Sequence, residues 1–233
     1  MAVHVVGLVI MALFTLGIFT RVTSVLTAML VISYANRATG VQFGLDQINC
    51  FLCLYLATGN SGGAFSLDRW WATRKSSAKA NPDDGPGRAG ESASGLNGLL
   101  NNIAVRLIQV HLCIVYLFAG LGKLQGSTWW NGEAVWGALA SYEYQTIDMT
   151  WLAHHLWLIN LLTLVALAWE VSYAVLIWNR LTRPIMLAIA VAVHLGIGLC
   201  MGMLEFGLIM LVANIAFIAS SPSNARSPSN ARS

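Results

Sequence analysis

The chain has 233 residues, of which 57% are hydrophobic and 10% are charged, and its formal net charge is +3. Ordinary soluble domains contain about 25% charged residues, so this composition excludes a soluble globular domain and predicts an integral membrane protein. Because lipid offers no partner for backbone N–H and C=O groups, the apolar runs are expected to be helices. We therefore predict an all-α, polytopic transmembrane helical bundle with about seven membrane-embedded helices and no sheet.

The first 60 residues contain three apolar runs, which we interpret as the first helical half of a membrane domain, residues 1–60. The runs cover about 2–19, 22–35 and 44–60. The second is short for a bilayer crossing, so it is expected to tilt or to thin the membrane locally. The chain starts directly before a hydrophobic run, without the basic leader of a signal peptide. We expect that an upstream helix is missing from a truncated or wrongly started chain.

Residues 61–104 differ sharply in composition from the apolar runs on either side. The part SSAKANPDDGPGRAGESASG combines Pro, Gly, Ser and charged residues with almost nothing to bury, which is typical of a flexible linker. Just before it, the stretch from Ser66 to Trp71 places aromatic and charged side chains together, as expected at the level of lipid headgroups. We predict a flexible cytoplasmic linker that joins two halves of one bundle.

The second helical half is predicted over residues 105–219. Its apolar runs cover about 105–122, 151–177 and 185–219. The last run is too long for one ordinary crossing and is interrupted near Cys200-Met201-Gly202, so we expect two helices there. Residues 220–233 repeat Ser-Pro-Ser-Asn-Ala-Arg twice and are predicted to be a disordered tail.

The distribution of basic residues predicts the orientation of the bundle. If each run crosses once, eleven of the 13 basic residues fall on one side, which the positive-inside rule assigns to the cytoplasm. Lys123 then faces the extracytoplasmic side of a membrane like the bacterial inner membrane. The eleven residues are Arg21, Arg69, Arg74, Lys75, Lys79, Arg88, Arg106, Arg180, Arg183, Arg226 and Arg232.

The stretch from Tyr116 to Trp136 carries the main candidate site. An apolar helix with no charge after Arg106 ends at Lys123. Such a lysine either extends its ammonium to the headgroups or is a partly desolvated amine that loses its proton easily and acts as a base. Tyr116, Gly120 and Lys123 share one helix face by their spacing.

The polar turn after Lys123 contains Trp129, Trp130 and Glu133, which are close enough in sequence to roof a pocket. We therefore select Lys123 and Glu133 as candidate catalytic residues. Tyr116, Gly120 and Trp130 are the candidate cofactor-binding residues, because glycine at 120 lets a flat ligand or another helix come close.

Two ionisable residues lie deeper in the predicted bundle. Glu170 is inside one apolar run and His194 inside the next, where unpaired charges are costly and usually face the bundle interior. They can pair with each other or with His111, and a structural role and a proton-handling role both remain open. His194 is the third candidate catalytic residue.

Other classes of site have weaker support in the sequence. Cys50 and Cys53 have the CxxC spacing of a redox pair, yet cysteine within an apolar helix is more often a small packing residue. The histidines are scattered or adjacent, so no metal site is predicted. Phosphate loops, serine triads and nucleic-acid-binding patches are absent from the sequence.

Several motifs together resemble the HTTM family, the membrane domain related to vitamin K-dependent gamma-carboxylase. The resemblance covers nearly the whole chain except the linker and the tail, and its most specific part is the helix that ends in Ala-Gly-x-x-Lys-Leu, followed by Trp-x-Gly. The matching segments are Gly17-Ile18-Phe19-Thr20-Arg21, Asp46-Gln47, Ser66-Leu67-Asp68, Tyr116-Leu117-Phe118-Ala119-Gly120-Leu121-Gly122-Lys123-Leu124, Trp130-x-Gly132 and His194.

The resemblance implies a chemistry for Lys123. In the carboxylase, the lysine of that motif is the proposed base that deprotonates vitamin K hydroquinone, which oxygen then converts to an epoxide. The strong base so formed removes a proton from a glutamate side chain, which takes up carbon dioxide. The carboxylase also has a large lumenal portion after its membrane domain that has no counterpart in this chain, so carboxylation of a protein substrate is not expected. The family's first helix has no counterpart either.

Three functions remain open. The first is an enzyme that oxidises vitamin K hydroquinone, another quinol or a related lipid-soluble substrate, with Lys123 as base and Glu133 or His194 assisting. The second is a non-catalytic membrane component that lies in the lipid bilayer and binds lipid, quinone, or a membrane or redox partner protein. The third is a DoxX-like thiol and quinone redox protein, which requires a disulfide between Cys50 and Cys53.

Overall fold

A computed structural model describes residues 1–37, 43–63, 66–79 and 88–219, and within these no strand occurs. The all-α prediction is confirmed. The helices of the amino-terminal part are α1 (Ala2–Leu16), α2 (Thr20–Arg37), α3 (Gly44–Thr58) and α4 (Leu67–Lys79). They are followed by α5 (Arg88–Lys123), α6 (Ser127–Trp130), α7 (Ala134–Leu139), α8 (Leu156–Leu176), α9 (Arg183–Cys200), α10 (Leu204–Asn214) and α11 (Ala216–Ala219). The predicted tail, 220–233, lies outside the described residues.

Three of the described helices are long and apolar enough to cross a membrane. They comprise Gly95–Lys123 within α5, together with Leu156–Leu176 and Arg183–Cys200. Ala2–Leu16 and Leu204–Ile218 are apolar but shorter. The coarse prediction of a helical membrane protein therefore holds. The predicted number of about seven embedded helices is larger than the three that length and composition support among the described residues.

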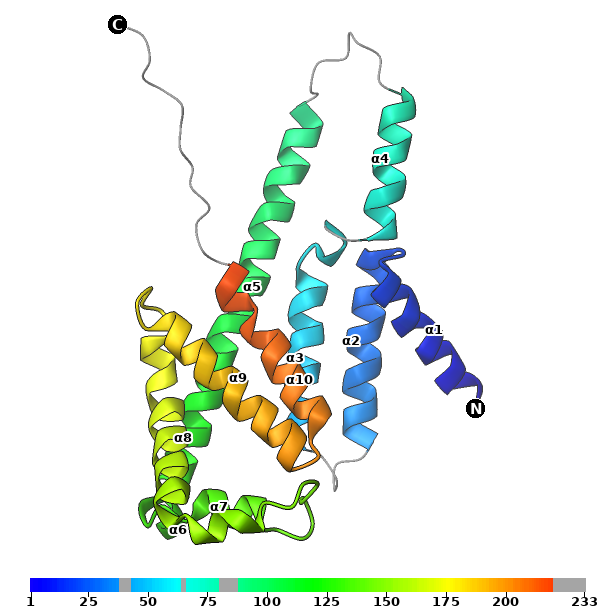
Figure 1. Cartoon of the computed structure of the whole chain (residues 1–233). Helices are drawn as coiled ribbons and strands as arrows, with labels where there is room; N and C mark the ends of the chain where they lie inside the picture. The colour runs from blue at the N-terminus through cyan, green and yellow to red at the C-terminus, as the bar shows by residue number, and fades with distance from the viewer. Residues whose placement is uncertain (38–42, 64–65, 80–87, 220–233) are drawn as a thin grey trace, which may run out of the picture.

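The core of the bundle lies where α5, α8, α9 and α10 meet, as Figure 1 shows. Aromatic residues of α5 and α8 form its centre, with Tyr116 3% exposed, Trp169 3% and Tyr173 0%. The Trp169 indole N–H donates to the Met186 carbonyl oxygen at 3.0 Å, which joins α8 to α9. Apolar side chains on the opposite faces, such as Phe118, point outward, as expected for surfaces in contact with lipid.

The turn between α9 and α10 confirms the predicted interruption of the last apolar run. Gly202 has φ +68°, a left-handed conformation that glycine adopts without steric cost. A Cβ atom at this position would lie 2.5 Å from the Thr146 hydroxyl oxygen, and the Thr146 N–H donates to the Cys200 carbonyl oxygen at 3.1 Å. The loop before α8 is thereby fixed to the turn.

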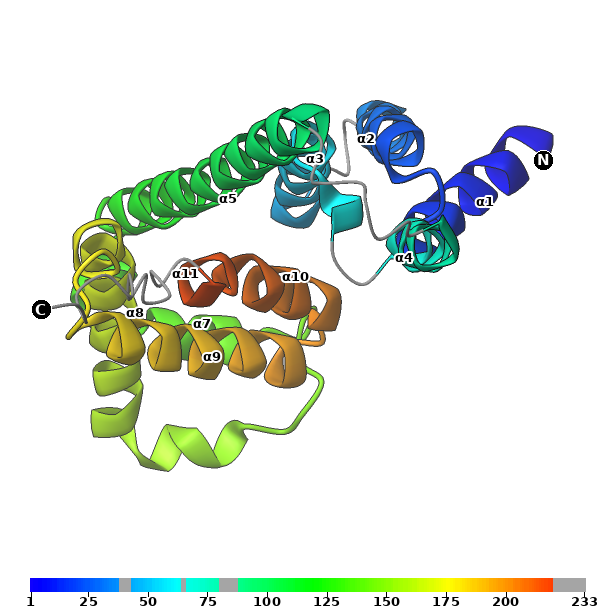
Figure 2. The same cartoon turned by 90° about the horizontal axis from the view of Figure 1, so that it is seen from above.

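Helix α3 contributes Ile48 to this core, α1 and α2 lie beside it, and α4 fixes the turn that connects α1 to α2 (Figure 2). The Asp68 carboxylate accepts hydrogen bonds from the backbone N–H of Thr20 at 2.8 Å and of Phe19 at 3.0 Å. These are free donors at the start of α2, so Asp68 acts as an N-cap supplied by another helix. The Thr20 N–H, with further help from the Phe19 N–H and the Thr20 hydroxyl, lowers the pKa of Asp68.

Much of the segment predicted as a linker is helical in the described residues. Helix α4 occupies Leu67–Lys79, and α5 begins at Arg88. Side chains hold the start of α5 to the bundle, since Arg21 donates to the Asn97 side chain at 2.5 Å and the Asn60 N–H to the Asn101 side chain at 2.6 Å. Residues 80–87 lie outside the described residues, and the division of the chain into two halves stays a prediction.

Candidate functional site

Lys123, the last residue of α5, forms an ion pair with Glu170 of α8. The Lys123 Nζ atom lies 2.7 Å from Glu170 Oε1 and 2.6 Å from Oε2. The side chains are 28% and 13% exposed, so the pair is shielded from bulk solvent but not sealed. It is the only ion pair found among the described residues. Lys123 is therefore bound inside the protein rather than extended freely to the headgroups.

A glycine allows α5 and α8 to approach at this point. A Cβ atom on Gly120 would lie 2.8 Å from Val171 Cγ2, 3.1 Å from the Val171 backbone N and 3.3 Å from Glu170 Cβ. No side chain larger than hydrogen fits there without a shift of the α8 backbone. Gly120 thus acts through helix packing, one turn before Lys123, and places the lysine beside the carboxylate.

The polar turn that follows Lys123 lies close to the pair, as its sequence position indicated. The Lys123 ammonium lies 5.3 Å from the centre of the Trp129 ring, within range of a cation–π interaction. The neighbouring Trp130 is 64% exposed, and its indole N–H donates to the Leu124 carbonyl oxygen at 2.7 Å. Trp129 therefore covers the lysine, whereas Trp130 stabilises the turn.

Glu133 is placed differently from the other candidates. It is exposed and occupies the N-cap position of α7, without a side-chain hydrogen bond to that helix. The adjacent Gly132 has φ +77°, and a Cβ atom there would lie 2.6 Å from Asn160 Oδ1, so the turn packs tightly against α8. The structure does not join Glu133 to Lys123 by a hydrogen bond, and its catalytic role stays a prediction.

A second polar cluster lies deeper, on the same face of α5. The Tyr116 hydroxyl lies 2.7 Å from His194 Nε2 of α9, and the Asn214 amide of α10 donates to the same hydroxyl at 3.0 Å. The Tyr173 hydroxyl of α8 donates to Asn214 Oδ1 at 2.5 Å. Side chains from four helices thus form one hydrogen-bonded network, in which Tyr116, Tyr173, His194 and Asn214 are each at most 5% exposed.

The two clusters are neighbours. Trp169 and Glu170 are consecutive in α8, and the Trp169 ring packs against both Tyr116 and His194, with ring centres 4.8 Å and 6.1 Å apart. The structure therefore brings Tyr116, Gly120, Lys123 and His194 into one region of the bundle and leaves Trp130 and Glu133 at its edge.

The polar pairings within the bundle differ from the alternatives that the sequence left open. Glu170 pairs with Lys123 and not with His194, and His194 contacts Tyr116. His111 lies 3.3 Å from the Tyr55 hydroxyl of α3. Spacing along one helix could not reveal these partners, because each lies on a different helix.

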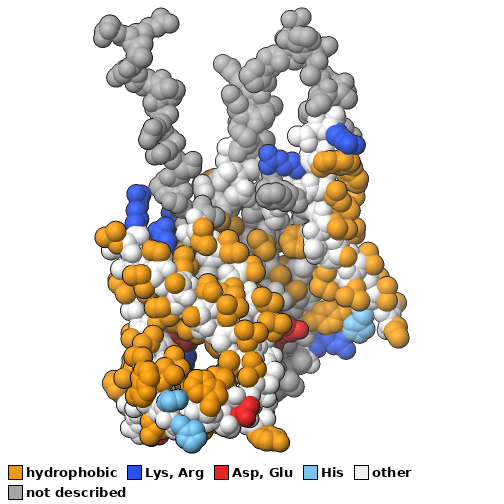
Figure 3. Space-filling view, viewed as in Figure 1, with side chains coloured by type: hydrophobic (Ala, Val, Ile, Leu, Met, Phe, Trp, Pro, Cys, Tyr) orange, Lys and Arg blue, Asp and Glu red, His pale blue; other side chains and the backbone are white. Residues whose placement is uncertain are grey.

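Figure 3 shows the outer surface of this face of the bundle. Hydrophobic side chains cover most of it, and basic side chains gather at its upper end. Low on the face the apolar cover is interrupted by a hollow, inside which an acidic and a basic side chain are visible. An opening of this kind suits a ligand that arrives from lipid.

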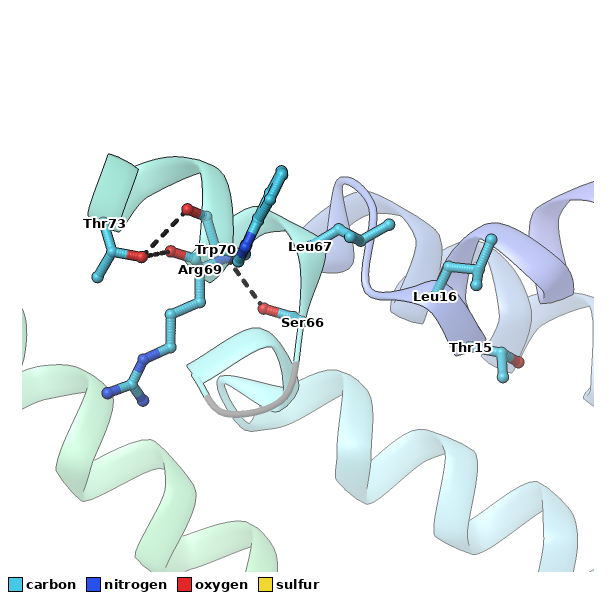
Figure 4. A pocket seen from close by; sticks show the side chains of 7 residues that line it. All are labelled: Thr15, Leu16, Ser66, Leu67, Arg69, Trp70 and Thr73. Carbon is cyan, nitrogen blue, oxygen red and sulfur yellow. Dashed lines mark hydrogen bonds between the residues drawn. The ribbon is translucent and has the colours of Figure 1, made fainter. Parts of the chain in front are cut away.

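A separate hollow lies at the opposite end of the fold, between the end of α1 and α4 (Figure 4). Its hydroxyl groups are engaged locally, since Ser66 accepts from the Arg69 N–H at 3.1 Å and Thr73 donates to the Arg69 and Trp70 carbonyl oxygens. No candidate site residue lines it. Among the described residues, no cluster of three or more His, Cys, Asp or Glu side chains is arranged to hold a metal ion.

The comparisons with known proteins gave one positive result. The family model described as HTTM domain matches residues 98–221, which is more than half of the chain. The matched region begins in the amino-terminal part of α5 and contains Tyr116, Lys123, Glu170, His194 and Asn214. Neither the curated proteins nor the solved structures gave a match to the chain.

Proposed function

The chain belongs to the HTTM domain family, a family linked to vitamin K-dependent carboxylase-like membrane proteins, and on this premise we propose that it deprotonates a quinol or a related lipid-soluble substrate. Lys123 is the base, and Glu170 is its proton-accepting partner. The observation that carries the proposal is the ion pair between them, which is partly shielded from solvent and lies where the membrane helix α5 ends. Residues of this kind inside membrane segments usually serve a function.

The pair can take up one proton in two transfers. Lys123 passes a proton to the Glu170 carboxylate through the 2.6 Å contact, and the resulting neutral amine removes the proton of the substrate hydroxyl. Glu170 then carries a proton as a carboxylic acid, Lys123 is again an ammonium ion, and the substrate has become an oxyanion. The ammonium stabilises that oxyanion in surroundings of low polarity.

The surroundings of the pair favour a flat, apolar substrate. The Trp129 ring lies over the lysine, and the outward faces of α5 and α8 are apolar, with Phe118 68% and Leu161 49% exposed. A quinol that diffuses in lipid meets an apolar surface before it reaches the pair. In the proposed enzyme, oxygen would then react with the bound oxyanion, as the family resemblance implies.

The same arrangement supports a proposal for sidedness. Arg21 and α4 lie at one end of the bundle, together with the connection between α8 and α9, which carries Arg180 and Arg183. Lys123 and the polar turn that contains α6 and α7 lie at the opposite end. By the positive-inside rule, we place the first end in the cytoplasm and the Lys123 site outside it.

The proposed function is tested by hydroquinone-dependent oxygen uptake and epoxide formation in membranes that contain the chain. Wild type is compared with Lys123→Met and Glu170→Gln at matched expression. Arg37→Met is the control, because it removes an exposed positive charge from the end of α2, at the same end of the bundle as Lys123. We expect activity in wild type and in the control, and its loss in both variants of the pair.

Two results would count against the proposal in different ways. Activity that survives Lys123→Met would exclude this lysine as the base. No activity in wild type would favour a non-catalytic membrane component, in which the ion pair only fixes α5 against α8. In that case Lys123→Met would still lower thermal stability, although neither wild type nor the variant would show turnover.

A further inference from the structure

His194 has one ring nitrogen without a partner in the described structure. Its side chain is 3% exposed, and Nε2 lies 2.7 Å from the Tyr116 hydroxyl, whereas Nδ1 is buried and makes no hydrogen bond. Buried polar atoms in proteins are nearly always paired. The tautomer of the imidazole decides whether Nδ1 donates or accepts a hydrogen bond, and therefore which ligand atoms it can bind.

Asn214 determines the direction of the hydrogen bonds around Tyr116. Its Nδ2 atom lies 2.8 Å from the Met210 carbonyl oxygen, which can only accept, so the amide nitrogen must face that carbonyl. The same nitrogen donates its second hydrogen to the Tyr116 hydroxyl at 3.0 Å, and Oδ1 accepts from Tyr173. With both hydrogens used, the amide cannot be flipped without placing two oxygens in contact.

This direction fixes the tautomer of His194. Because the Tyr116 oxygen accepts from Asn214, its single proton is free to be donated to His194 Nε2. A neutral imidazole that accepts at Nε2 carries its hydrogen on Nδ1. The opposite tautomer would leave the Tyr116 proton without an acceptor in this network. The unpaired Nδ1 is therefore a hydrogen-bond donor.

We propose that His194 Nδ1–H donates to an oxygen of the bound quinone or quinol and holds that end of the ring. This inference rests on the proposed function and adds a second contact to it. The imidazole is surrounded by aromatic rings, with Trp169, Tyr116 and Phe206 ring centres at 5.9–6.1 Å. Such surroundings favour a flat ligand that offers an oxygen as acceptor.

The two clusters lie at successive levels of one face of α5, an order that suits a ligand with oxygens at opposite ends. Tyr116 and Lys123 lie on one face of α5, seven residues apart, or about 10 Å along the helix axis. A para-quinol has one oxygen at each end of its ring. In this arrangement the Lys123 and Glu170 pair takes the proton from one hydroxyl, and His194 donates to the oxygen at the other end. Tyr116 and Asn214 act as positioning residues, because they set the tautomer.

The tautomer and the ligand contact are measured separately on full-length protein in lipid nanodiscs. Nitrogen-15 NMR of labelled histidine reports which ring nitrogen of His194 carries hydrogen. Infrared difference spectroscopy with carbonyl-labelled menadione reports whether a carbonyl oxygen accepts a hydrogen bond, since that bond lowers the carbonyl stretching frequency. Equilibrium dialysis of menadione measures binding itself.

Two substitutions of the same kind make a matched comparison. Tyr116→Phe removes the hydroxyl that donates to His194, and Tyr173→Phe removes one that contacts only Asn214 in this network. We expect the Nδ1–H tautomer and a lowered carbonyl frequency in wild type and in Tyr173→Phe. In Tyr116→Phe we expect a mixture of tautomers and a smaller frequency shift. Both substitutions keep the aromatic ring, so the core is retained.

The outcomes separate this inference from the proposed function. An Nε2–H tautomer in wild type would overturn the inference and leave the proposed function standing. Bound menadione with an unshifted carbonyl frequency would do the same, and it would assign a buried water molecule as the partner of His194 Nδ1–H. No binding of menadione would overturn the inference and the quinone class of substrate together. Oxygen uptake that survives Lys123→Met, combined with the expected carbonyl shift, would overturn the base but not the His194 contact.

Discussion

Gly120 provides a sharp test of the packing on which the site depends. A Cβ atom there would lie 2.8 Å from Val171 Cγ2 and 3.1 Å from the backbone N of the same residue. Gly120→Ala must therefore displace the backbone of α8 as well as a side chain. Gly122, two residues further along α5, has nothing within 4 Å of the corresponding position. Gly122→Ala is thus a matched control on the same helix.

The expected difference in stability follows from two contributions. Overpacking a well-packed core by added methyl groups costs about 1–3 kcal/mol. Both substitutions gain up to about 1 kcal/mol because alanine favours a helix more than glycine does. The free energy of unfolding should therefore be about 1–3 kcal/mol lower for Gly120→Ala than for Gly122→Ala. For a chain of this length the difference is roughly 2–12 °C in Tm.

Thermal unfolding of the two variants in the same detergent measures this difference. Gly120→Ala should also reduce quinol-dependent activity, because moving α8 separates Glu170 from Lys123. Equal Tm values for the two variants would show that α5 and α8 are not in close contact at Gly120. The close approach at Gly120 would then not be what places Lys123 beside Glu170.

Three further predictions follow from other contacts. The pKa of Asp68 is lowered, so its stabilising effect is present above about pH 4 and is lost as the pH falls through the lowered pKa. Asp68→Ala should lower the free energy of unfolding by about 1 kcal/mol at pH 7, and this difference should vanish in acid. A difference that does not depend on pH would contradict the capping role. A double-mutant cycle of Lys123→Met and Glu170→Gln by thermal unfolding should give a coupling of about 1–3 kcal/mol, between the values for exposed and buried pairs, and zero coupling would show that the pair is not formed. Replacing both Cys50 and Cys53, which are free thiols, with Ser should leave quinol-dependent activity unchanged, and loss of activity would favour the DoxX-like redox alternative.

Much of the helical framework could be predicted because it depends on local sequence. The apolar runs of the first 60 residues correspond to α1, α2 and α3, and the interruption near Gly202 separates α9 from α10. The start of α5 could not be predicted, because its small and polar residues resemble a linker. Asn97 and Asn101 hold that part through side-chain hydrogen bonds to residues distant in the sequence.

The candidate site was predictable only along one helix. Helical spacing placed Tyr116, Gly120 and Lys123 on one face, and these three do face α8 and α9. The partners of that face come from other helices, so spacing could not identify Glu170 as the partner of Lys123. Asn214 gave no signal in the sequence, since one asparagine near the end of an apolar run is also typical of a helix end.

The most direct measurement of the central claim observes the proton transfer without oxygen. A naphthol whose hydroxyl stays protonated in neutral water, such as 2-naphthol, changes its ultraviolet absorption when it loses that proton, so its bound state can be read by spectroscopy. If Lys123 and Glu170 take a proton from a bound hydroxyl, wild type and Gly122→Ala should bind the probe as the oxyanion. Lys123→Met and Glu170→Gln should bind it as the neutral naphthol. Equal oxyanion fractions in wild type and Lys123→Met, with binding confirmed by dialysis, would contradict the role of Lys123 as base.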